Sequence, residues 1–211
     1  MEHTVTAAAS NASNTPTLSF KDWMAHIQAQ VESSLDALLP QPNTRPERLH
    51  SAMRYAAMDG GKRVRPLLTF AAAEASAQAV SPQALAQVAC SVELIHAYSL
   101  VHDDMPCMDD DILRRGKPTC HVQYDEATAL LVGDALQTHA FECLSDASLP
   151  FTPAQQLQML RTLSHASGAA GMCGGQAIDC DSVGHILDLS ELQQMHSLKT
   201  GALMRAAILL G

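Results

Sequence analysis

The chain has 211 residues, of which 47% are hydrophobic, 4% aromatic and 17% charged, and its 22 acidic residues outnumber its 13 basic residues to give a net charge of −9. This composition is typical of a globular protein and excludes a disordered or collagen-like chain. The negative balance argues against nucleic-acid binding, which needs a basic face. We therefore expect no nucleic-acid partner.

The first 17 residues are small and polar and show no periodicity, so we expect a flexible tail at 1–17 ahead of one domain at 18–211. The N-terminus has neither the basic segment nor the apolar run of a signal peptide. No stretch approaches 18 uninterrupted apolar residues, the length that a membrane helix needs. We therefore expect a cytoplasmic protein without a membrane span.

Hydrophobic residues then recur at three- and four-residue intervals, which predicts a first helix from Phe20 until Pro40 ends the pattern. Alternating strand patterns are almost absent, and the periodic segments are rich in Ala, Leu, Met and Gln. The sequence therefore predicts an all-α fold. Further helical stretches are expected at about 45–58, 66–78, 82–104, 121–146, 153–171 and 189–210.

The six cysteines show no CxxC spacing and stand mostly in apolar surroundings, which predicts reduced thiols packed in the core rather than a disulfide framework. They are Cys90, Cys107, Cys120, Cys143, Cys173 and Cys180.

Two breaks between the predicted helices carry more charge than a plain connector needs. The first, 60–66, places Lys62 and Arg65 beside a Gly-Gly turn whose bare backbone can approach a ligand. The second, 102–111, holds five aspartates within nine residues, and Arg114 and Arg115 follow it. These carboxylates would repel one another unless a cation lay between them, and a hard divalent metal is the natural candidate.

Pro106 stands between the two ends of this aspartate cluster. On a regular helix Asp109, six residues after Asp103, would lie on a different face. A proline forces the helix to bulge or end, which we expect near Cys107. The distortion can bring Asp109 back to the side of Asp103 and so create a mouth of two carboxylates for a metal.

His96 lies seven residues before Asp103 and therefore on the same helix face two turns earlier. It can donate a hydrogen bond to an anion, although a satisfied core histidine is an open alternative. Arginine and lysine are the natural diphosphate ligands. The sequence has no P-loop, no GxSxG elbow and no HExxH pattern. An apolar helical cavity with metal-binding carboxylates and basic clusters favours ionisation of an apolar diphosphate.

At these residues the sequence strongly resembles the trans-type polyprenyl diphosphate synthases, most closely the bacterial farnesyl diphosphate synthases. The resemblance runs from about Phe20 to the C-terminus. It is carried by GGKRVRP (60–66), ELIHAYSLVHDDMPCMDDDILRRGKPTCH (93–121), GDAL (133–136), GGQAIDC (174–180) and KTGALMRAA (199–207). It implies an isoprenoid-synthase helical bundle around a central apolar cavity and a head-to-tail prenyl transfer between isopentenyl diphosphate and a short allylic diphosphate.

The resemblance also implies roles for individual residues. Mg²⁺ is expected on Asp103 and Asp109, with Asp104 and Asp110 in the same shell or supporting it. Isopentenyl diphosphate is expected on Lys62, Arg65, His96 and Arg115. The allylic diphosphate is expected on Arg114, Lys199 and Thr200, with Gln176 and Asp179 shaping that side unless they only form a helix-kink network.

Tyr98, with Ser99 beside it, is the expected determinant of product length. Tyr98 lies five residues before Asp103, about 7.5 Å back along the helix axis. Its ring there would form the floor of the pocket, as in family members that make the C15 product farnesyl diphosphate. A simple packing role between helices is the alternative.

The apolar helix around Gly133 and Asp134 is the expected homodimer face by family resemblance. Gly133 itself is expected to allow a close approach between helices.

The family's second aspartate-rich motif, preceded by a Phe-Gln pair, does not occur in this sequence. We therefore expect a farnesyl diphosphate synthase that lacks its C-terminal third and has poor or no turnover alone. One alternative is a non-catalytic or regulatory partner of a prenyltransferase. A metal-dependent phosphohydrolase that uses a His-Asp doublet, with His96, His102, His121 and His139, is a more remote one.

Overall fold

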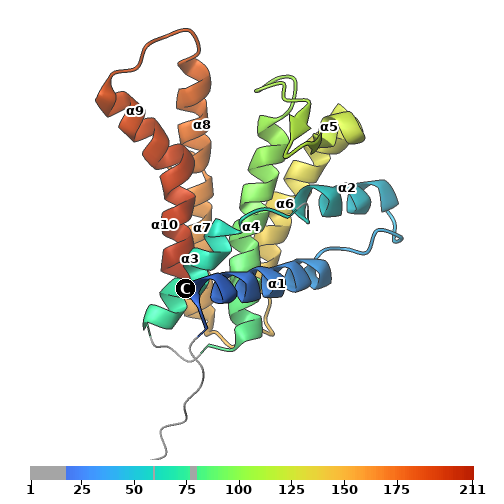
Figure 1. The fold of residues 1–211 in the computed structure, drawn as a ribbon, viewed down its shortest axis with the longest axis vertical. Coiled ribbons are helices and arrows are strands. Elements are labelled where there is room, and N and C mark those ends of the chain that lie inside the picture. The colour runs from blue at the N-terminus through green and yellow to red at the C-terminus, as the bar shows by residue number, and fades with distance from the viewer. Residues whose placement is uncertain (1–17, 59, 77–79) are drawn as a thin grey trace, which may run out of the picture.

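The structure is a computed structural model that describes residues 18–58, 60–76 and 80–211, so the tail expected at 1–17 lies outside the described residues. The described chain is helical apart from a two-stranded hairpin, which confirms the all-α prediction (Figure 1). The helices are α1 (Phe20–Leu38), α2 (Glu47–Ala57), α3 (Val64–Ser76), α4 (Pro82–Asp103), α5 (Cys120–Gln123), α6 (Glu126–Ser145), α7 (Pro153–Ser167), α8 (Met172–Asp181), α9 (Leu189–His196) and α10 (Ala202–Leu210), with a π-helical turn η1 (Ser197–Gly201) before α10 and the strands β1 (Leu113–Arg114) and β2 (Lys117–Pro118).

Side-chain caps begin several of the helices where the sequence offers them. Ser19 accepts a hydrogen bond from the backbone of Asp22 at the start of α1, and Ser81 does the same at α4 ahead of a proline in the first turn. Thr152 and Asp188 form capping boxes at α7 and α9. These local signals place the helix starts within a few residues of the predicted ones.

Two predicted helices are shorter or more divided than expected. The stretch 121–146 is split at Asp125, whose carboxylate accepts from the backbone N–H of Thr128 and so begins α6 anew after the short α5. The helix predicted at 153–171 ends at Ser167, four residues early. No helix was predicted at 172–181, where the structure has α8. Two adjacent glycines in this segment lower its intrinsic helix propensity.

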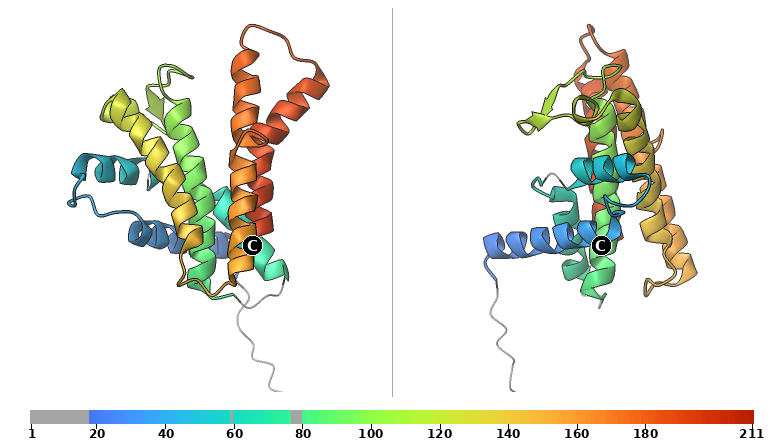
Figure 2. Two further views of the ribbon diagram at one scale, coloured as in Figure 1. Left: turned by 180° about the vertical axis from the view of Figure 1, so that it is seen from behind. Right: turned by 90° about the vertical axis from the view of Figure 1, so that its right-hand side faces the viewer.

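Helix α4 is the centre of the fold. Of its 22 residues, 14 are buried, including Leu94 and Ile95, which are fully enclosed, so it packs on all sides rather than on one stripe. By length and composition α4 could cross a bilayer, but 72% of its most apolar 18-residue window is buried inside the protein, as in a core helix. Figure 2 shows α6 alongside it in both views.

Gly133 of α6 makes the close contact between these two helices possible. A Cβ atom at Gly133 would lie 1.9 Å from Nε2 of His102 on α4, so only glycine leaves room for that ring. The imidazole Nε2 also lies 3.0 Å from the carbonyl oxygen of Leu130, one turn earlier on α6. The expectation that Gly133 serves close helix packing is confirmed.

The second half of the bundle is formed by α7 and α8 in one column and by α9, η1 and α10 in another (Figure 1). The aspartate turn after α4 and the connection between α8 and α9 lie at the same end of the molecule, the upper end in Figure 1. This arrangement brings the C-terminal end of α4 toward α8 and η1, which are more than 60 residues later in the sequence.

All six cysteines are free thiols, but only three of them belong to the core. Cys90, Cys120 and Cys143 are buried, and burial raises the pKa of the Cys120 and Cys143 thiols to about 12. The prediction of core packing is wrong for Cys107, Cys173 and Cys180, which are exposed. Cys107 lies in the turn after α4 and the other two on α8, the segment whose helix the sequence did not reveal.

Candidate active site

A cavity of about 380 Å³ lies between the C-terminal end of α4, the start of α3, α8 and η1. It brings together most of the residues that the sequence selected: Arg65, His96, Tyr98, Ser99, Asp103, Gln176, Lys199 and Thr200. An adjoining hollow of about 280 Å³ is lined by Asp109 and Asp179. Arg114 and Arg115 line a separate, smaller hollow together with Asp104.

The turn after α4 returns Asp109 to the neighbourhood of Asp103. Helix α4 ends at Asp103, three residues before Pro106 and four residues before Cys107, where we expected the break. The backbone N–H of Asp109 donates to the carbonyl oxygen of Asp103 at 2.9 Å, and Asp110 adopts a left-handed conformation with φ 53°. The two carboxylates expected to share a metal are therefore carried by residues that are joined through their backbones.

Asp104 is placed differently from Asp103. Its side chain is 4% exposed and both of its carboxylate oxygens accept from Arg114, at 2.5 to 3.0 Å, in a bidentate ion pair. This arrangement suits the supporting role that was one of the two expectations for Asp104, and in this conformation the guanidinium of Arg114, expected at the allylic diphosphate, is paired with Asp104. In this conformation the pair braces the aspartate turn.

The donor set at Asp103 and Asp109 fits a hard divalent cation. Within the described ranges no three His, Cys, Asp or Glu side chains form a ready metal cluster. Burial raises the pKa of Asp103 to about 6, and the charge of Asp109 adds to that rise, whereas Lys199 and Arg114 oppose it. A cation between the two carboxylates would relieve this cost, and carboxylate oxygens are the ligands that such ions prefer.

His96 and Arg65 form the basic side of the cavity. Burial, together with the positive charges of Arg65, Arg115, Arg114 and Arg63, lowers the pKa of His96 to about 3, so the imidazole is neutral at pH 7. Burial also lowers the pKa of Arg65, and its Nε is enclosed without a hydrogen-bond partner in the described structure. Both side chains thus have unused donors beside the cavity.

The other wall of the cavity depends on a close contact between α8 and η1. A Cβ atom at Gly175 would lie 2.1 Å from the backbone nitrogen of Lys199, so glycine is required there. The π-helical turn over Ser197–Gly201 carries Lys199 and Thr200 to the cavity, a use of π-helix that is frequent at functional sites.

Lys199 and Gln176 differ in how their polar groups are satisfied. Lys199 Nζ donates to Asp179 at 2.5 Å. Although burial lowers the pKa of Lys199, this ion pair and the charges of Asp103 and Asp109 outweigh it and raise the pKa. The Oε1 atom of Gln176 is buried without a partner in the described structure.

Tyr98 lies in the wall of the cavity, one helical turn and a half behind Asp103. Tyr98 is 8% exposed, and its ring contacts the imidazole of His102 edge to face, with the ring centroids 5.9 Å apart. Because Gly133 of α6 leaves space for His102, the edge-to-face pair of Tyr98 and His102 fits between α4 and α6. This is the position at which the ring can limit the depth of the cavity.

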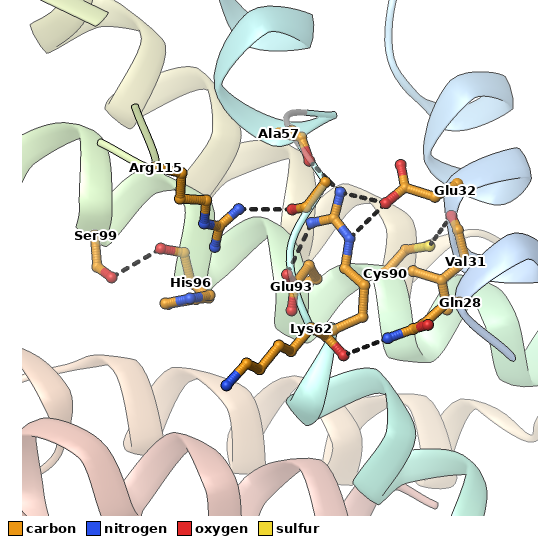
Figure 3. A network of polar contacts seen from close by, with 12 residues as sticks. Gln28, Val31, Glu32, Ala57, Lys62, Cys90, Glu93, His96, Ser99 and Arg115 are labelled. Atoms are coloured by element: carbon orange, nitrogen blue, oxygen red, sulfur yellow. Dashed lines mark hydrogen bonds and ion pairs between the residues drawn. The ribbon is translucent and has the colours of Figure 1, made fainter. Parts of the chain in front are cut away.

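The loop before α3 presents Lys62. Arg115 Nη1 donates to the carbonyl oxygen of Gly60 at 2.6 Å, and a side chain at Gly61, which has φ 120°, would collide with the guanidinium of Arg115. Figure 3 shows the Lys62 side chain extending away from Glu32, on the side where His96 lies. Lys62 makes no side-chain hydrogen bond or ion pair to the described residues.

Sequence reasoning missed Arg63, Glu32 and Glu93, which form a buried ion-pair network beside the cavity (Figure 3). A signal was available at Glu93, because this acid stands in the apolar run of α4 and a buried acid needs a partner. Which basic residue would meet it could not be read from the sequence.

The fold is that of the all-helical isoprenoid synthases, with a cavity that is lined by Asp103 together with basic and amide side chains. The family model described as polyprenyl synthetase matches residues 46–211, and the chain belongs to this family. The chain is 48% identical over 197 residues to a farnesyl diphosphate synthase of Escherichia coli and 45% identical over 192 residues to one of Haemophilus influenzae. These alignments cover 90% and 91% of this chain.

Solved structures give the same result. An apo FPP/GFPP synthase from Zymomonas mobilis superposes with a TM-score of 0.85 at 44% identity and covers 90% of this chain. A geranyltransferase from Legionella pneumophila superposes with a TM-score of 0.85 at 38% identity. The chain spans 64% of the length of the two curated relatives and 68% of the Zymomonas structure.

Proposed function

We propose that this protein condenses isopentenyl diphosphate with dimethylallyl or geranyl diphosphate to give farnesyl diphosphate. The observation that carries the proposal is that one cavity is lined by Arg65, His96, Asp103 and Lys199 together. Relatives named farnesyl diphosphate synthase at 40 to 48% identity support the same reaction.

Isopentenyl diphosphate is proposed to bind on the basic side. Lys62, Arg65 and Arg115 supply the positive charge, and the neutral His96 donates one N–H. Arg65 is suited to this role because its buried Nε has no partner in the described structure. Filling that donor with a diphosphate oxygen would remove the cost of an unpaired buried group.

The allylic diphosphate is proposed to lie at the other wall, where Lys199 and Thr200 contact its phosphates and Gln176 borders its first isoprene unit. Mg²⁺ held by Asp103 and Asp109 would neutralise the departing diphosphate. The carbon–oxygen bond of the allylic ester breaks, the double bond of isopentenyl diphosphate attacks the allylic carbon, and a proton leaves to the released diphosphate. Asp104 and Arg114 act by keeping the aspartate turn in place.

The apolar part of the cavity is proposed to hold the growing chain, with Tyr98 and Ser99 at its lower end. Tyr98→Ala would deepen the pocket, so we expect products longer than fifteen carbons on chromatography. An unchanged product profile would assign Tyr98 to helix packing alone.

We further propose a cytoplasmic homodimer that uses the outer face of α6. Leu131 on this helix is 55% exposed and borders a hollow of about 620 Å³ between α6 and α2. An exposed leucine that adjoins a hollow suits a second copy of the chain. A monomeric mass in sedimentation at micromolar concentration would contradict this.

Binding and turnover test the proposed reaction separately. Calorimetry with isopentenyl diphosphate tests the basic side, and we expect Arg65→Ala to weaken binding by about 100-fold because a charge-assisted bidentate contact is lost. Incubation with Mg²⁺, isopentenyl diphosphate and geranyl diphosphate then tests product formation. Failure of the chain to bind either diphosphate, with or without Mg²⁺, would overturn the proposal.

A further inference from the structure

Arg63 lies between two residues assigned to the ligand, yet its side chain points the other way. It is 4% exposed and adopts a left-handed backbone conformation with φ 48°, which costs about 1 kcal/mol for a non-glycine residue. A left-handed residue between Lys62 and the start of α3 reverses the direction of its side chain relative to its neighbours. Such a conformation persists only where surrounding contacts enforce it.

Those contacts occupy nearly the whole guanidinium. Its Nε and Nη2 both lie 2.8 Å from Glu32 Oε1 on α1, and its Nη1 lies 2.8 Å from Glu93 Oε1 on α4. Nη2 also donates to the carbonyl oxygen of Ala57 at the end of α2, at 2.8 Å. One side chain therefore connects α1, α4 and α2 to the loop through Glu32, Glu93 and Ala57, which Figure 3 labels.

The remaining contacts of this loop use its backbone. Gln28 of α1 donates to the carbonyl oxygen of Lys62 at 2.9 Å, and Arg115 donates to the carbonyl oxygen of Gly60. Within the described residues, the hydrogen bonds and ion pairs that hold the loop use the Arg63 side chain and main-chain atoms. The side chains of Lys62 and Arg65 make none of these contacts and remain available to a ligand.

Glu93 connects this network to the cavity. It lies one helical turn before His96 on α4, and its negative charge supports the charged form of Arg65. Its second oxygen, Oε2, is buried without a partner in the described structure. The ion pair between Arg63 and Glu93 therefore sets the distance between the loop and the helix that carries His96.

We propose that Arg63 is a positioning residue that, through Glu32 and Glu93, holds the loop 60–65 so that Lys62 and Arg65 face one diphosphate. This rests on the proposed function, because it assigns the loop to isopentenyl diphosphate. Arg63 does not itself touch the ligand. Its loss should therefore weaken binding on the basic side and leave the allylic side unchanged.

The experiment uses variants that keep the fold. Arg63→Met would leave Glu93 as a buried unpaired charge and could prevent folding, so the test uses Arg63→Lys and Glu32→Gln. In Arg63→Lys a single ammonium group replaces the guanidinium that contacted three partners. In Glu32→Gln the side chain keeps its shape and loses its charge, and Glu32 is 35% exposed. Glu74→Gln is the matched control, because Glu74 accepts from Trp23 between α3 and α1 at 2.7 Å without touching the loop.

Hydrogen exchange of the 60–65 amides and calorimetry with isopentenyl and geranyl diphosphates are measured on each variant after a thermal melt has shown that it is folded. We expect Arg63→Lys and Glu32→Gln to speed exchange in 60–65 and weaken isopentenyl diphosphate by about tenfold, because a small displacement of the loop misplaces both donors. Geranyl diphosphate binding and the control should change less than about twofold.

The two possible failures are distinguishable. If folded Arg63→Lys binds isopentenyl diphosphate as tightly as the wild-type chain does, the positioning role alone is overturned. Equal losses for both diphosphates also overturn it, because they indicate a general effect on stability. If the wild-type chain binds neither diphosphate, the proposed function is overturned and the positioning role with it.

Discussion

The loop before α3 and the turn after α4 each contain neighbouring side chains of like charge. In each segment one of these side chains is buried in an ion pair, while another stays available. In the loop, Arg63 is buried between Glu32 and Glu93, while Lys62 and Arg65 stay available. In the turn, Asp104 is buried against Arg114, while Asp103 lines the cavity. The anchor in the loop meets two acids from two helices, whereas the anchor in the turn meets one arginine only ten residues away.

This difference indicates how firmly each segment is held. The loop is fixed from outside by α1, α2 and α4, so its conformation depends on the assembled bundle. The turn is fixed mostly from within, by Arg114 and by the hydrogen bond from Asp109 to Asp103. We therefore expect the turn to keep its shape when distant helices are perturbed and the loop to lose it.

The largest expected effect separates Asp103 from Asp104. Asp103→Asn should weaken Mg²⁺-dependent diphosphate binding by more than about 100-fold, because it removes a proposed metal ligand. Because burial raises the pKa of Asp103, its ionised carboxylate lowers the stability of the folded chain at neutral pH, so Asp103→Asn should raise the free energy of unfolding. Calorimetry with and without Mg²⁺, with urea unfolding as the stability measurement, checks both. Equal Mg²⁺ dependence in the variant and the wild-type chain would reject Asp103 as a ligand.

Substitution of Arg114 tests the anchor of the turn. Arg114→Ala leaves the Asp104 carboxylate buried and unpaired, so the free energy of unfolding should fall by about 2 kcal/mol. Arg115→Ala is the neighbouring control and should lower it by less than about 1 kcal/mol, because Arg115 is exposed. Urea unfolding measures both. Equal losses for the two arginines would show that the Asp104 pair is not the anchor.

A smaller effect should appear on the basic side when the pH is lowered. The unfolded chain protonates His96 below about pH 6.5, whereas the folded chain keeps it neutral down to about pH 3, so protonation favours unfolding in this window. Between pH 6.5 and 5.5 the wild-type chain should lose about 1 kcal/mol relative to His96→Gln. Urea unfolding at both pH values measures this difference. A constant difference would mean that His96 titrates normally.

The smallest effect concerns the thiols around the cavity. Cys107, Cys173 and Cys180 should react with N-ethylmaleimide in the folded chain, while Cys90, Cys120 and Cys143 should react only after denaturation. Peptide mass spectrometry identifies the labelled residues. Labelling of a buried thiol at native pH would show that α4 or α6 opens more readily than the structure indicates.

The helical fold could be predicted from local signals because period and caps depend on neighbouring residues. The predicted helices around α1 and α4 match the structure closely, and α4 ends shortly before Pro106. Helix α8 was missed because its glycines are unfavourable for an isolated helix, and the need for Gly175 arises only from the close backbone of Lys199. The π-helical turn has no local signal either, since its register depends on that same contact.

The amino-acid sequence by itself determined the fold class, the family and the two charged segments, because these depend on residue type and spacing. Only the tertiary structure decided which charges serve the cavity. Asp103 and Asp104 are adjacent and chemically identical. Arg63 and Arg65 are also chemically identical and are separated by one residue. Nothing in the local sequence distinguishes the members of either pair. Each arrangement follows from what lies opposite: Glu32 and Glu93 pair with Arg63 and Arg114 pairs with Asp104, whereas Arg65 and Asp103 form no such ion pair among the described residues and line the cavity.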